Sequence, residues 1–349
     1  MFKQKVAIGL LALAGGVFAD AISPASYSAN LDVGGSVTIT KTVTVTHEAP
    51  TTAPVDVYFL ADETGSMGGT IAAIKAGAAS IMSSVAGLGD VQFAVGGYRD
   101  VGSEYPSSHT SYRMLQDFTS NTAAVQTGIN TWAASGGGDL PEADLFGLQS
   151  AANGASWRAG STRILVWFGD APGHDPSSGA TLATATGALT AKNIQVQAID
   201  VGSMNSSGQA TSIATATDGH YYSGINSSSI VSTITSAITT TIDEYSSVKL
   251  AVEGLGTGVG VNITPVGGYT GAYTRATDKT FDFNVTFTGL TAGADENFKI
   301  NALVDGGVVA VETDHITVNG TTGAVPEPGT LALMGLGLVT LVGASRRRK

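Results

Sequence analysis

The chain of 349 residues contains no cysteine. This absence excludes disulfide bonds and cysteine-ligated metals, so an exported form must be held together by its core or by oxygen-ligated ions. Charged residues are scarce, at 13% of the sequence, while hydrophobic residues make up 43%. The length is sufficient for two compact domains with cores of their own. This composition is typical of a globular protein with a polar but weakly charged surface.

The sequence also lacks the common motifs of catalysis. Ser66 does not fit the G-x-S-x-G nucleophile elbow, because Thr64 stands where that motif requires glycine. We find no H-E-x-x-H metal motif, no phosphate-binding loop and no dinucleotide fingerprint. Nothing in the sequence positively supports catalysis, and we expect a protein that is not an enzyme.

Basic residues are few, at 17 against 28 acidic residues, which gives a formal net charge of −11. Lys and Arg are concentrated at the two ends, so the chain between them is more acidic still. An acidic surface argues against binding to nucleic acid or to anionic lipid. It is compatible with cation binding and with solubility outside the cell.

The N-terminal residues 1–21 have the pattern of a secretory signal peptide. Lys3 and Lys5 precede an apolar stretch over residues 6–18, and small residues follow at 19–21, where we expect cleavage. A buried N-terminal helix is the alternative. The pattern therefore predicts export.

The C-terminal residues 323–349 form a second terminal signal. The sequence VPEP is followed by an apolar segment over 330–343 and by the basic cluster at 346–349. The apolar segment is shorter than the ~20 residues of a full membrane span, and the basic cluster should stay cytoplasmic. This order resembles the PEP-CTERM sorting signal of Gram-negative bacteria that produce exopolysaccharide. The resemblance implies cleavage by an exosortase, membrane contact only through this segment before cleavage, and then attachment or release at the cell surface.

Between the two terminal signals, the pattern of apolar and polar residues changes twice. Residues 28–48 alternate Val or Ile with Thr or Lys, as half-buried strands do. From residue 55 apolar strands alternate with amphipathic helices, which predicts a doubly wound, mostly parallel α/β sheet covered on both faces. After residue 245 short strands follow one another, as in a small β-sandwich. We expect strands within 22–53 to complete a sandwich with 246–322, and an α/β domain over 54–245 to be inserted between them.

Within the α/β region the pattern assigns most elements. We expect strands over 55–62, 91–100, 162–170 and 194–202, a short strand near 220–222, and helices over 67–87, 122–134, 141–152, 180–192, 207–217 and 227–244.

Acidic and hydroxyl side chains follow the buried strands of this region. Asp62 ends one strand and Asp170 another, Thr64 and Ser66 come directly after Asp62, and Glu142 lies in a glycine-rich loop before a helix. Ligands bind doubly wound sheets at the carboxyl ends of their strands. Three carboxylates without a basic partner would repel one another unless a cation lay between them. Hydroxyls and carboxylates favour Mg²⁺, with Mn²⁺ or Ca²⁺ as alternatives.

Each of these residues also has a purely local interpretation. Asp62, Thr64 and Ser66 are suited to capping the helix that begins near Met67. Glu142 is favoured near a helix start by the helix dipole, and Asp170 suits a turn.

The combination resembles a von Willebrand factor A domain, over about residues 54–245. The resemblance implies a metal-ion-dependent adhesion site with Asp62, Thr64, Ser66, Glu142 and Asp170 as its ligands. The segment GGDLPEADLFGL is most similar to the integrin β-subunit version, in which the domain is likewise inserted into a β-sandwich.

The integrin β version also implies neighbouring cation sites. Asp139, the carbonyl of Pro141 and Glu142 match part of one such site, and Asp100 offers a further carboxylate. Gly137 stands where that version has an asparagine. The acidic pair of another adjacent site is replaced by residues 68–70, so we expect that site to be missing.

These signals together predict an exported protein at the cell surface or outside the cell. We expect Mg²⁺-dependent adhesion to an acidic group on a partner protein or polysaccharide. The alternative is a structural component of a matrix or surface layer whose cation only stabilises the fold.

Overall fold

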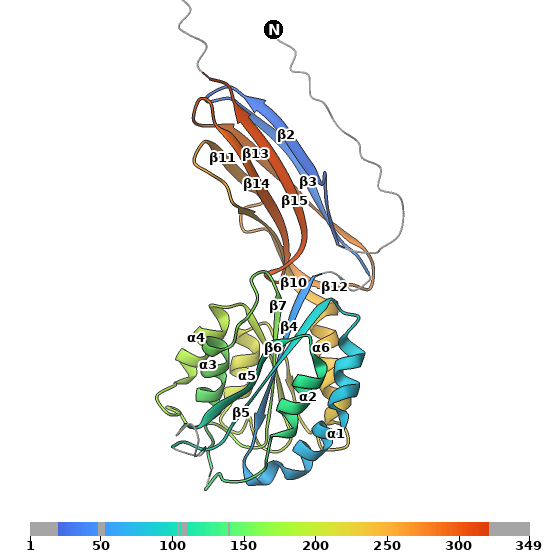
Figure 1. Ribbon diagram of the computed structural model, residues 1–349, viewed down its shortest axis with the longest axis vertical. Helices are drawn as coiled ribbons and strands as arrows, with labels where there is room; N and C mark the ends of the chain where they lie inside the picture. The colour runs from blue at the N-terminus through green and yellow to red at the C-terminus, as the bar shows by residue number, and fades with distance from the viewer. Residues whose placement is uncertain (1–19, 48–52, 103–104, 106–109, 139, 321–349) are drawn as a thin grey trace, which may run out of the picture.

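The structure is a computed structural model that describes residues 20–47, 53–102, 105, 110–138 and 140–320. The sorting signal, most of the signal peptide and Asp139 lie outside the described residues. The molecule is elongated, with an α/β layer at one end and long β-strands at the other (Figure 1).

A six-stranded sheet forms the centre of the α/β end. Its order is β6 (Tyr112–Thr119), β5 (Asp90–Tyr98), β4 (Pro54–Asp62), β7 (Thr162–Gly169), β8 (Ile194–Asp200) and β9 (Tyr221–Tyr222). All neighbouring pairs are parallel except β5 and β6, which are antiparallel. The prediction of a mostly parallel sheet is confirmed. The sequence analysis did not predict β6, whose residues are mostly half-buried at the sheet edge and show no alternation of apolar side chains.

Helices cover both faces of this sheet. One face packs against α1 (Gly68–Val85), α2 (Thr122–Asn130) and α6 (Ile230–Asp243), and the other against α3 (Asp144–Gly154), α4 (Leu182–Thr190) and α5 (Gln209–Ala216). A 3₁₀ turn, η1 (Gly65–Met67), leads into α1. Each face has its own apolar core, with strand residues such as Phe59 on one side and Leu60 on the other. The alternation of side chains along buried strands produces this division.

The third predicted helix begins later than expected. Pro141 was predicted in its first turn, but α3 begins at Asp144. The N–H of Glu142 donates to the carbonyl of Pro172, and the N–H of Ala143 donates to that of Arg99. These hydrogen bonds tie Glu142 and Ala143 to two other loops, and the helix begins only after them.

The strands at the other end of the molecule form two further sheets. The four-stranded sheet has the order β1 (Ala21–Ser23), β3 (Ser36–Val45), β13 (Lys279–Gly289) and β11 (Val259–Thr264). The five-stranded sheet has the order β12 (Tyr269–Thr274), β10 (Glu244–Glu253), β14 (Asp295–Val304), β15 (Gly307–Val318) and β2 (Ser26–Leu31). Both therefore combine strands that precede the α/β region with strands that follow it.

Long pairings connect these distant segments. β3 pairs antiparallel with β13 from Ser36 opposite Thr288 to Val45 opposite Lys279. β2 pairs parallel with β15. One apolar core includes side chains of both sheets, among them Val43, Phe283 and Ile300. The sheets thus bury their inner faces against each other.

The described chain begins within the span predicted as signal peptide. Asp20 is buried, and its carboxylate accepts hydrogen bonds from both terminal nitrogens of Arg275, at 2.8 and 2.7 Å. Ala21 is the first residue of β1. The last two residues of the predicted segment 1–21 are therefore part of the fold.

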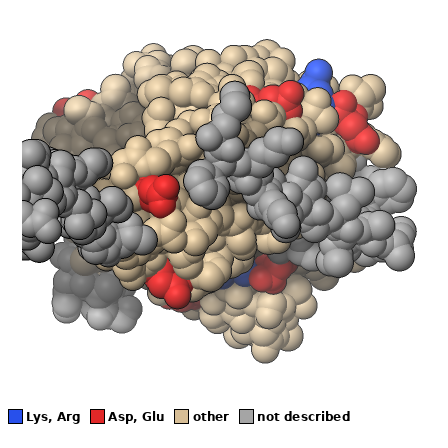
Figure 2. All heavy atoms as spheres, turned by 90° about the horizontal axis from the view of Figure 1, so that it is seen from above, with Lys and Arg blue, Asp and Glu red and all other residues tan. Residues whose placement is uncertain are grey.

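The surface is mostly uncharged. On the face shown in Figure 2, acidic groups are scattered among uncharged residues, with only small basic areas. Among the described residues, no helix combines the length and the hydrophobicity that a membrane crossing requires.

Candidate functional site

The candidate site lies at the carboxyl ends of β4 and β7. These two strands are neighbours at the centre of the sheet. The chain leaves β4 toward α1 on one face, whereas it leaves β7 toward α4 on the opposite face. The two connections therefore diverge at this point, which is where α/β sheets bind ligands. Asp62 ends β4 and Asp170 directly follows β7, so both acids lie at this point of the sheet edge.

The first turn after β4 brings Asp62, Thr64 and Ser66 together. Asp62 Oδ1 accepts hydrogen bonds from both the N–H and the Oγ1 of Thr64, each at 2.8 Å. Thr64 Oγ1 lies 3.3 Å from Ser66 Oγ. Asp62 and Thr64 are buried, whereas Ser66 is exposed. The three side chains form a line of oxygen atoms from the sheet to the surface.

Helix capping does not account for these side chains. No side chain forms a cap hydrogen bond at the start of η1 or of α1, in a region that the structure describes fully. The local turn uses Asp62 Oδ1 but leaves Oδ2 without a hydrogen bond among the described residues. Asp170 Oδ1 is likewise buried without a hydrogen-bond partner there. Buried carboxylate oxygens normally have partners, so these two atoms are candidates for binding a cation.

The electrostatics of Asp62 are unfavourable for a free carboxylate. Burial, with a smaller contribution from the charge of Asp170, raises its pKa to about 7, although the hydrogen bonds from Thr64 act to lower it. The Asp62 side chain is buried, and no basic side chain is among the groups that shift this pKa. A cation would remove the repulsion between the two acids.

Glu142 reaches the same region from a different loop. A Cβ atom on Gly137 would lie 2.8 Å from Thr64 Cβ and 3.2 Å from Glu142 Oε1, so this glycine packs between the two residues. The N–H of Gly65 donates to the carbonyl of Gly136, which joins the loop to the turn after β4. The structure thus brings the loop acid Glu142 and the hydroxyl residue Thr64 of the first turn to either side of one glycine.

The second predicted cation site has fewer of its residues in place. Asp100 Oδ1 accepts a hydrogen bond from the N–H of Val101 at 2.6 Å and lies 3.3 Å from His174 Nε2. The N–H of His174 donates to the carbonyl of Glu142. Asp100 and Glu142 therefore lie on adjacent segments that His174 bridges. Within the described residues the Pro141 carbonyl accepts no backbone hydrogen bond.

Two further acids near the site were missed by the sequence analysis. Asp144 is fully buried, burial raises its pKa well above the ordinary value, and its Oδ2 makes no hydrogen bond within the described part of the chain. The charge of Asp62 raises the pKa of Asp144 further. Asp144 lies two residues after Glu142, and this proximity could have identified it as a residue of the site.

The other missed acid, Glu63, holds the site together. Its carboxylate pairs with Arg113 of β6 and accepts hydrogen bonds from Tyr105 Oη at 2.7 Å and from the N–H of Ala133 at 2.9 Å. The N–H of Ser135 donates to the Glu63 carbonyl. Glu63 thus ties the glycine-rich loop to the end of β4. Sequence alone gave no sign of this role, because Arg113 lies in the strand that was not predicted.

The donor atoms fit a hard divalent cation. Within the described residues, no group of three or more His, Cys, Asp or Glu side chains is arranged to bind a metal. The candidate set instead combines carboxylates with two hydroxyls, and all of its atoms are oxygens, as Mg²⁺ requires. The residues able to hold such an ion are Asp62, Thr64, Ser66, Glu142 and Asp170.

Comparison with known families identifies the α/β domain and the C-terminal segment. A family model described as von Willebrand factor A domain matches residues 56–237, which is more than half of the chain. The chain belongs to the von Willebrand factor A domain family. A second model, the PEP-CTERM protein-sorting motif, matches residues 324–349. This motif implies an exported protein that is processed by an exosortase.

Solved structures show a similar fold at low sequence identity. The von Willebrand factor type A protein from Catenulispora acidiphila is 14% identical, with a TM-score of 0.47, and the match covers 84% of this chain and 72% of that one. The pilus adhesin SpaC from Lactobacillus rhamnosus GG, in an open conformation, is 14% identical, with a TM-score of 0.43 and coverage of 81% and 45%. Proximal thread matrix protein 1 from the mussel byssus is 14% identical, with a TM-score of 0.42 and coverage of 58% and 48%. No curated protein gave a significant match.

Proposed function

We propose that this von Willebrand factor A protein is a metal-dependent adhesion protein of the cell surface or extracellular matrix. The observation that carries the proposal is the pair of buried carboxylate oxygens, Asp62 Oδ2 and Asp170 Oδ1, that lack hydrogen-bond partners within the described chain. Both atoms lie at the carboxyl ends of the two central strands, β4 and β7, beside two hydroxyls. Burial of a carboxylate without a partner costs free energy, and a bound cation would provide a partner for both oxygen atoms.

In this proposal Mg²⁺ is held by the carboxylates of Asp62 and Asp170, the hydroxyls of Thr64 and Ser66, and Glu142. Mn²⁺ and Ca²⁺ are alternatives with the same oxygen preference. Ser66 is exposed and Asp170 is half-buried, so the open side of the site faces solvent. When bound, the cation supplies positive charge that accepts one further oxygen ligand.

The ligand that suits such a site is an acidic group on a partner protein or on a polysaccharide. The chain carries a net charge of −11 and would repel an anion elsewhere on its surface. The cation overcomes this repulsion at one point, which makes binding both local and cation-dependent. No role in catalysis is proposed, and binding to nucleic acid is not expected.

The remainder of the chain serves to present this site. We propose that residues 22–53 and 246–322 form one split β-sandwich into which the α/β domain is inserted. The terminal segment 323–349 would hold the protein in the inner membrane until exosortase cleavage. A surface setting among exopolysaccharide in a biofilm of a Gram-negative organism is consistent with this design.

A structural role is the alternative, and binding to a carboxylated surface separates the two. The full chain is applied to immobilised alginate, a polyuronate, with neutral dextran as the matched surface, in Mg²⁺ and again in EDTA. We expect retention on alginate in Mg²⁺, loss in EDTA, and a chain that stays folded in EDTA by circular dichroism. The variant Ser66→Ala should lose retention, whereas Ser83→Ala, an exposed serine of α1, should not.

Two outcomes would contradict the adhesion proposal. Equal retention in Mg²⁺ and in EDTA would show that binding does not use the cation. Unfolding of the chain in EDTA, with no retention in Mg²⁺, would favour the structural role instead.

A further inference from the structure

A lysine and two acids meet in the core between the two β-sheets. Lys41 occupies an inward-facing position of β3, in register with the apolar Ile39 and Val43. Glu312 and Asp314 occupy successive inward-facing positions of β15. All three side chains are completely buried. Because β3 and β15 belong to different sheets, the three side chains meet across the core.

The amine is in direct contact with both acids. Lys41 Nζ contacts Glu312 Oε1 and lies 3.3 Å from Oδ1 and 3.2 Å from Oδ2 of Asp314. The aromatic rings of Tyr27 and Phe287 border the amine, with ring centroids 5.8 and 5.7 Å from Nζ. Within the described residues Glu312 Oε2 makes no hydrogen bond. The cluster is therefore an amine and two carboxyl groups in an apolar, aromatic setting.

A plain ion pair does not account for this arrangement. One ammonium group neutralises one carboxylate, and the charge of the second acid would remain in the apolar core, where an unpaired charge is strongly unfavourable. Joining the amine to one acid as an amide removes one positive and one negative charge together. The new amide N–H then serves as a donor for the carboxyl group that remains.

The same surroundings favour the reactive forms of the two groups. Burial lowers the pKa of Lys41 to about 8, although the charge and hydrogen bond of Asp314 raise it in part. Burial raises the pKa of Asp314, against the charge of Lys41. The neutral amine is thus far more populated near neutral pH than for a lysine in water. A neutral amine is a nucleophile, and a carboxyl group that readily gains a proton is suited to proton transfer.

We propose that Lys41 and Glu312 form an intramolecular isopeptide bond, and that Asp314 transfers the protons. The neutral Nζ of Lys41 attacks Cδ of the protonated Glu312, and a C–N bond forms. Asp314 accepts a proton from the nitrogen and returns it to the departing hydroxyl. The C–O bond breaks and one water molecule leaves, while Asp314 ends in its starting state. No oxidant, reductant or further reactant is needed.

This bond would join the segment before the α/β domain to the last strand after it. It encloses the whole α/β domain in a covalent loop, and a cross-link of this kind stabilises a fold by restricting the unfolded chain. The strand β15 ends at Val318, shortly before the sorting motif at 324–349. A pull on the C-terminal end would reach β3 through covalent bonds, in a chain that has no cysteine for a disulfide.

Peptide mass mapping of the full chain tests the proposal. The purified chain is shown to be folded by circular dichroism, then denatured and digested with trypsin. We expect the peptide that contains Lys41 joined to the one that contains Glu312, lighter by one water than their sum, with no cleavage after Lys41. Lys41→Met should abolish the joined species, while Lys299→Met, an exposed lysine of β14, should retain it. Asp314→Asn should reduce the joined fraction at least tenfold.

The native chain gives the decisive result, so a variant that fails to fold does not affect the test. Recovery of the two peptides unjoined and at full mass, from folded protein, would overturn the proposal. A joined species that fragments to place the bond at Asp314 would overturn the assignment of Glu312 as the acceptor.

Discussion

At the scale of single residues, the candidate site depends on close packing around Gly137. Gly137 adopts a φ of +70°, in the region that favours glycine, and lies against both Thr64 and Glu142. A methyl group at this position would meet Thr64 Cβ at 2.8 Å. From the sequence alone, Gly137 is recognisable only as a departure from the integrin β pattern, which has an asparagine there. Its place between two candidate ligands explains why glycine stands there.

Gly137→Ala should therefore damage the site and the loop together. We expect a loss of about 1–3 kcal/mol in the free energy of unfolding, because the new side chain adds backbone strain and a close contact. Cation affinity should fall by about tenfold or more, since small displacements weaken preorganised sites strongly. The neighbouring Gly138→Ala is the matched control, because no atom of the described residues lies within 4 Å of the added atom. Equal behaviour of the two variants in urea unfolding and Mg²⁺ titration would contradict this account.

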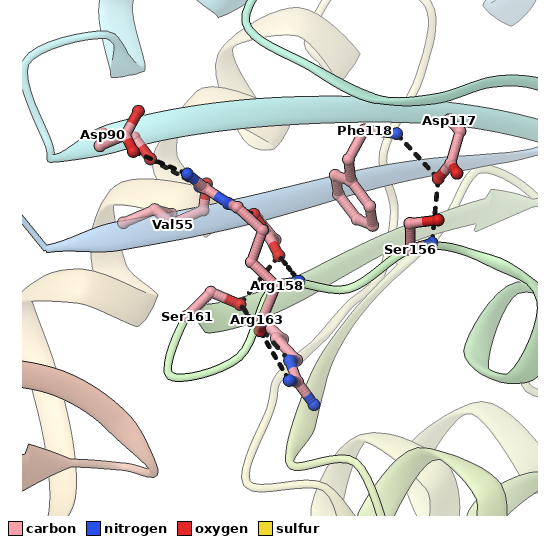
Figure 3. A network of polar contacts seen from close by, with 9 residues as sticks. Val55, Asp90, Asp117, Phe118, Ser156, Arg158, Ser161 and Arg163 are labelled. Atoms are coloured by element: carbon pink, nitrogen blue, oxygen red, sulfur yellow. Dashed lines mark hydrogen bonds and ion pairs between the residues drawn. The ribbon is translucent and has the colours of Figure 1, made fainter.

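At the scale of elements, a polar network fixes the end of the sheet opposite the site. Arg158 bonds to Asp56 Oδ1 at 2.6 Å, to Asp90 Oδ2 at 2.7 Å, and to the carbonyls of Val55 and Asp90 (Figure 3). Asp56 is completely buried, and Ser161 also donates to it. One arginine thus ties the starts of β4 and β5 to the loop before β7.

Arg158→Met should separate stability from binding. Removal of the arginine leaves the buried carboxylate of Asp56 without its cation, and such losses cost about 3–5 kcal/mol. The pair with Asp90 should contribute little, because that carboxylate is 58% exposed. Urea unfolding should show the loss, while Mg²⁺ affinity of the folded variant stays within about twofold of the parent. Full stability in the variant would contradict the importance of the network.

A second link between elements predicts a dependence on pH. Tyr58 of β4 and Tyr112 of β6 share a hydrogen bond of 2.7 Å between their hydroxyls. Burial raises the pKa of Tyr112 from the ordinary 10.0 to about 12, and raises that of Tyr58 well above its usual value. The folded chain therefore keeps protons between pH 10 and 12 that the unfolded chain loses. The free energy of unfolding should fall as pH rises through this interval.

Urea unfolding at pH 9 and at pH 11 measures this effect. Tyr112→Phe removes one of the responsible groups, so its stability should fall less between the two pH values than that of the parent chain. The control variant is Tyr269→Phe, which replaces a half-buried tyrosine of β12. Its stability should fall between the two pH values as much as that of the parent chain. A parent chain whose stability does not change with pH over this range would show that these hydroxyls are not protected by the fold.

Element patterns explain how much of the fold could be predicted. The continuous apolar runs of β4, β7 and β8 and the six helices of the α/β region were identifiable, because their periods are strong. β6 was missed, since its side chains are half-buried at an edge and mix Arg, Gln and Asp with apolar residues. The predicted start of α3 was wrong, because Glu142 and Ala143 donate hydrogen bonds to carbonyls of distant loops. Contacts of this kind are not encoded in a local pattern.

At the scale of the whole molecule, the position of the strand-end acids could be predicted from the sequence, whereas the contacts that support them could not. Strand ends in a parallel sheet meet at one edge, so Asp62 and Asp170 could be placed together from sequence alone. The roles of Glu63 and Asp144 depend on where β6 and the loop after β7 come to lie, which only the assembled fold shows. The same holds for Lys41, Glu312 and Asp314, which are far apart in the chain and join two sheets.

The molecule is elongated, and the proposed cation site lies at the end of the α/β layer away from the C-terminal end of β15 (Figure 1). β15 leads to the C-terminal motif, and the carboxyl ends of β4 and β7 lie at the far end of the α/β layer (Figure 1). A protein held by its C-terminal segment would thus present the site outward. This arrangement suits the proposed adhesion, which depends on a cation bound at the site.

Calorimetric titration of Mg²⁺ into the full chain tests that claim most directly. We predict saturable binding by the parent chain, and none by Asp62→Ala, with both proteins folded by circular dichroism before titration. The variant should be no less stable than the parent in EDTA, because it loses a buried acid whose pKa burial has raised to about 7. A folded parent chain that takes up neither Mg²⁺, Mn²⁺ nor Ca²⁺ would contradict the central claim.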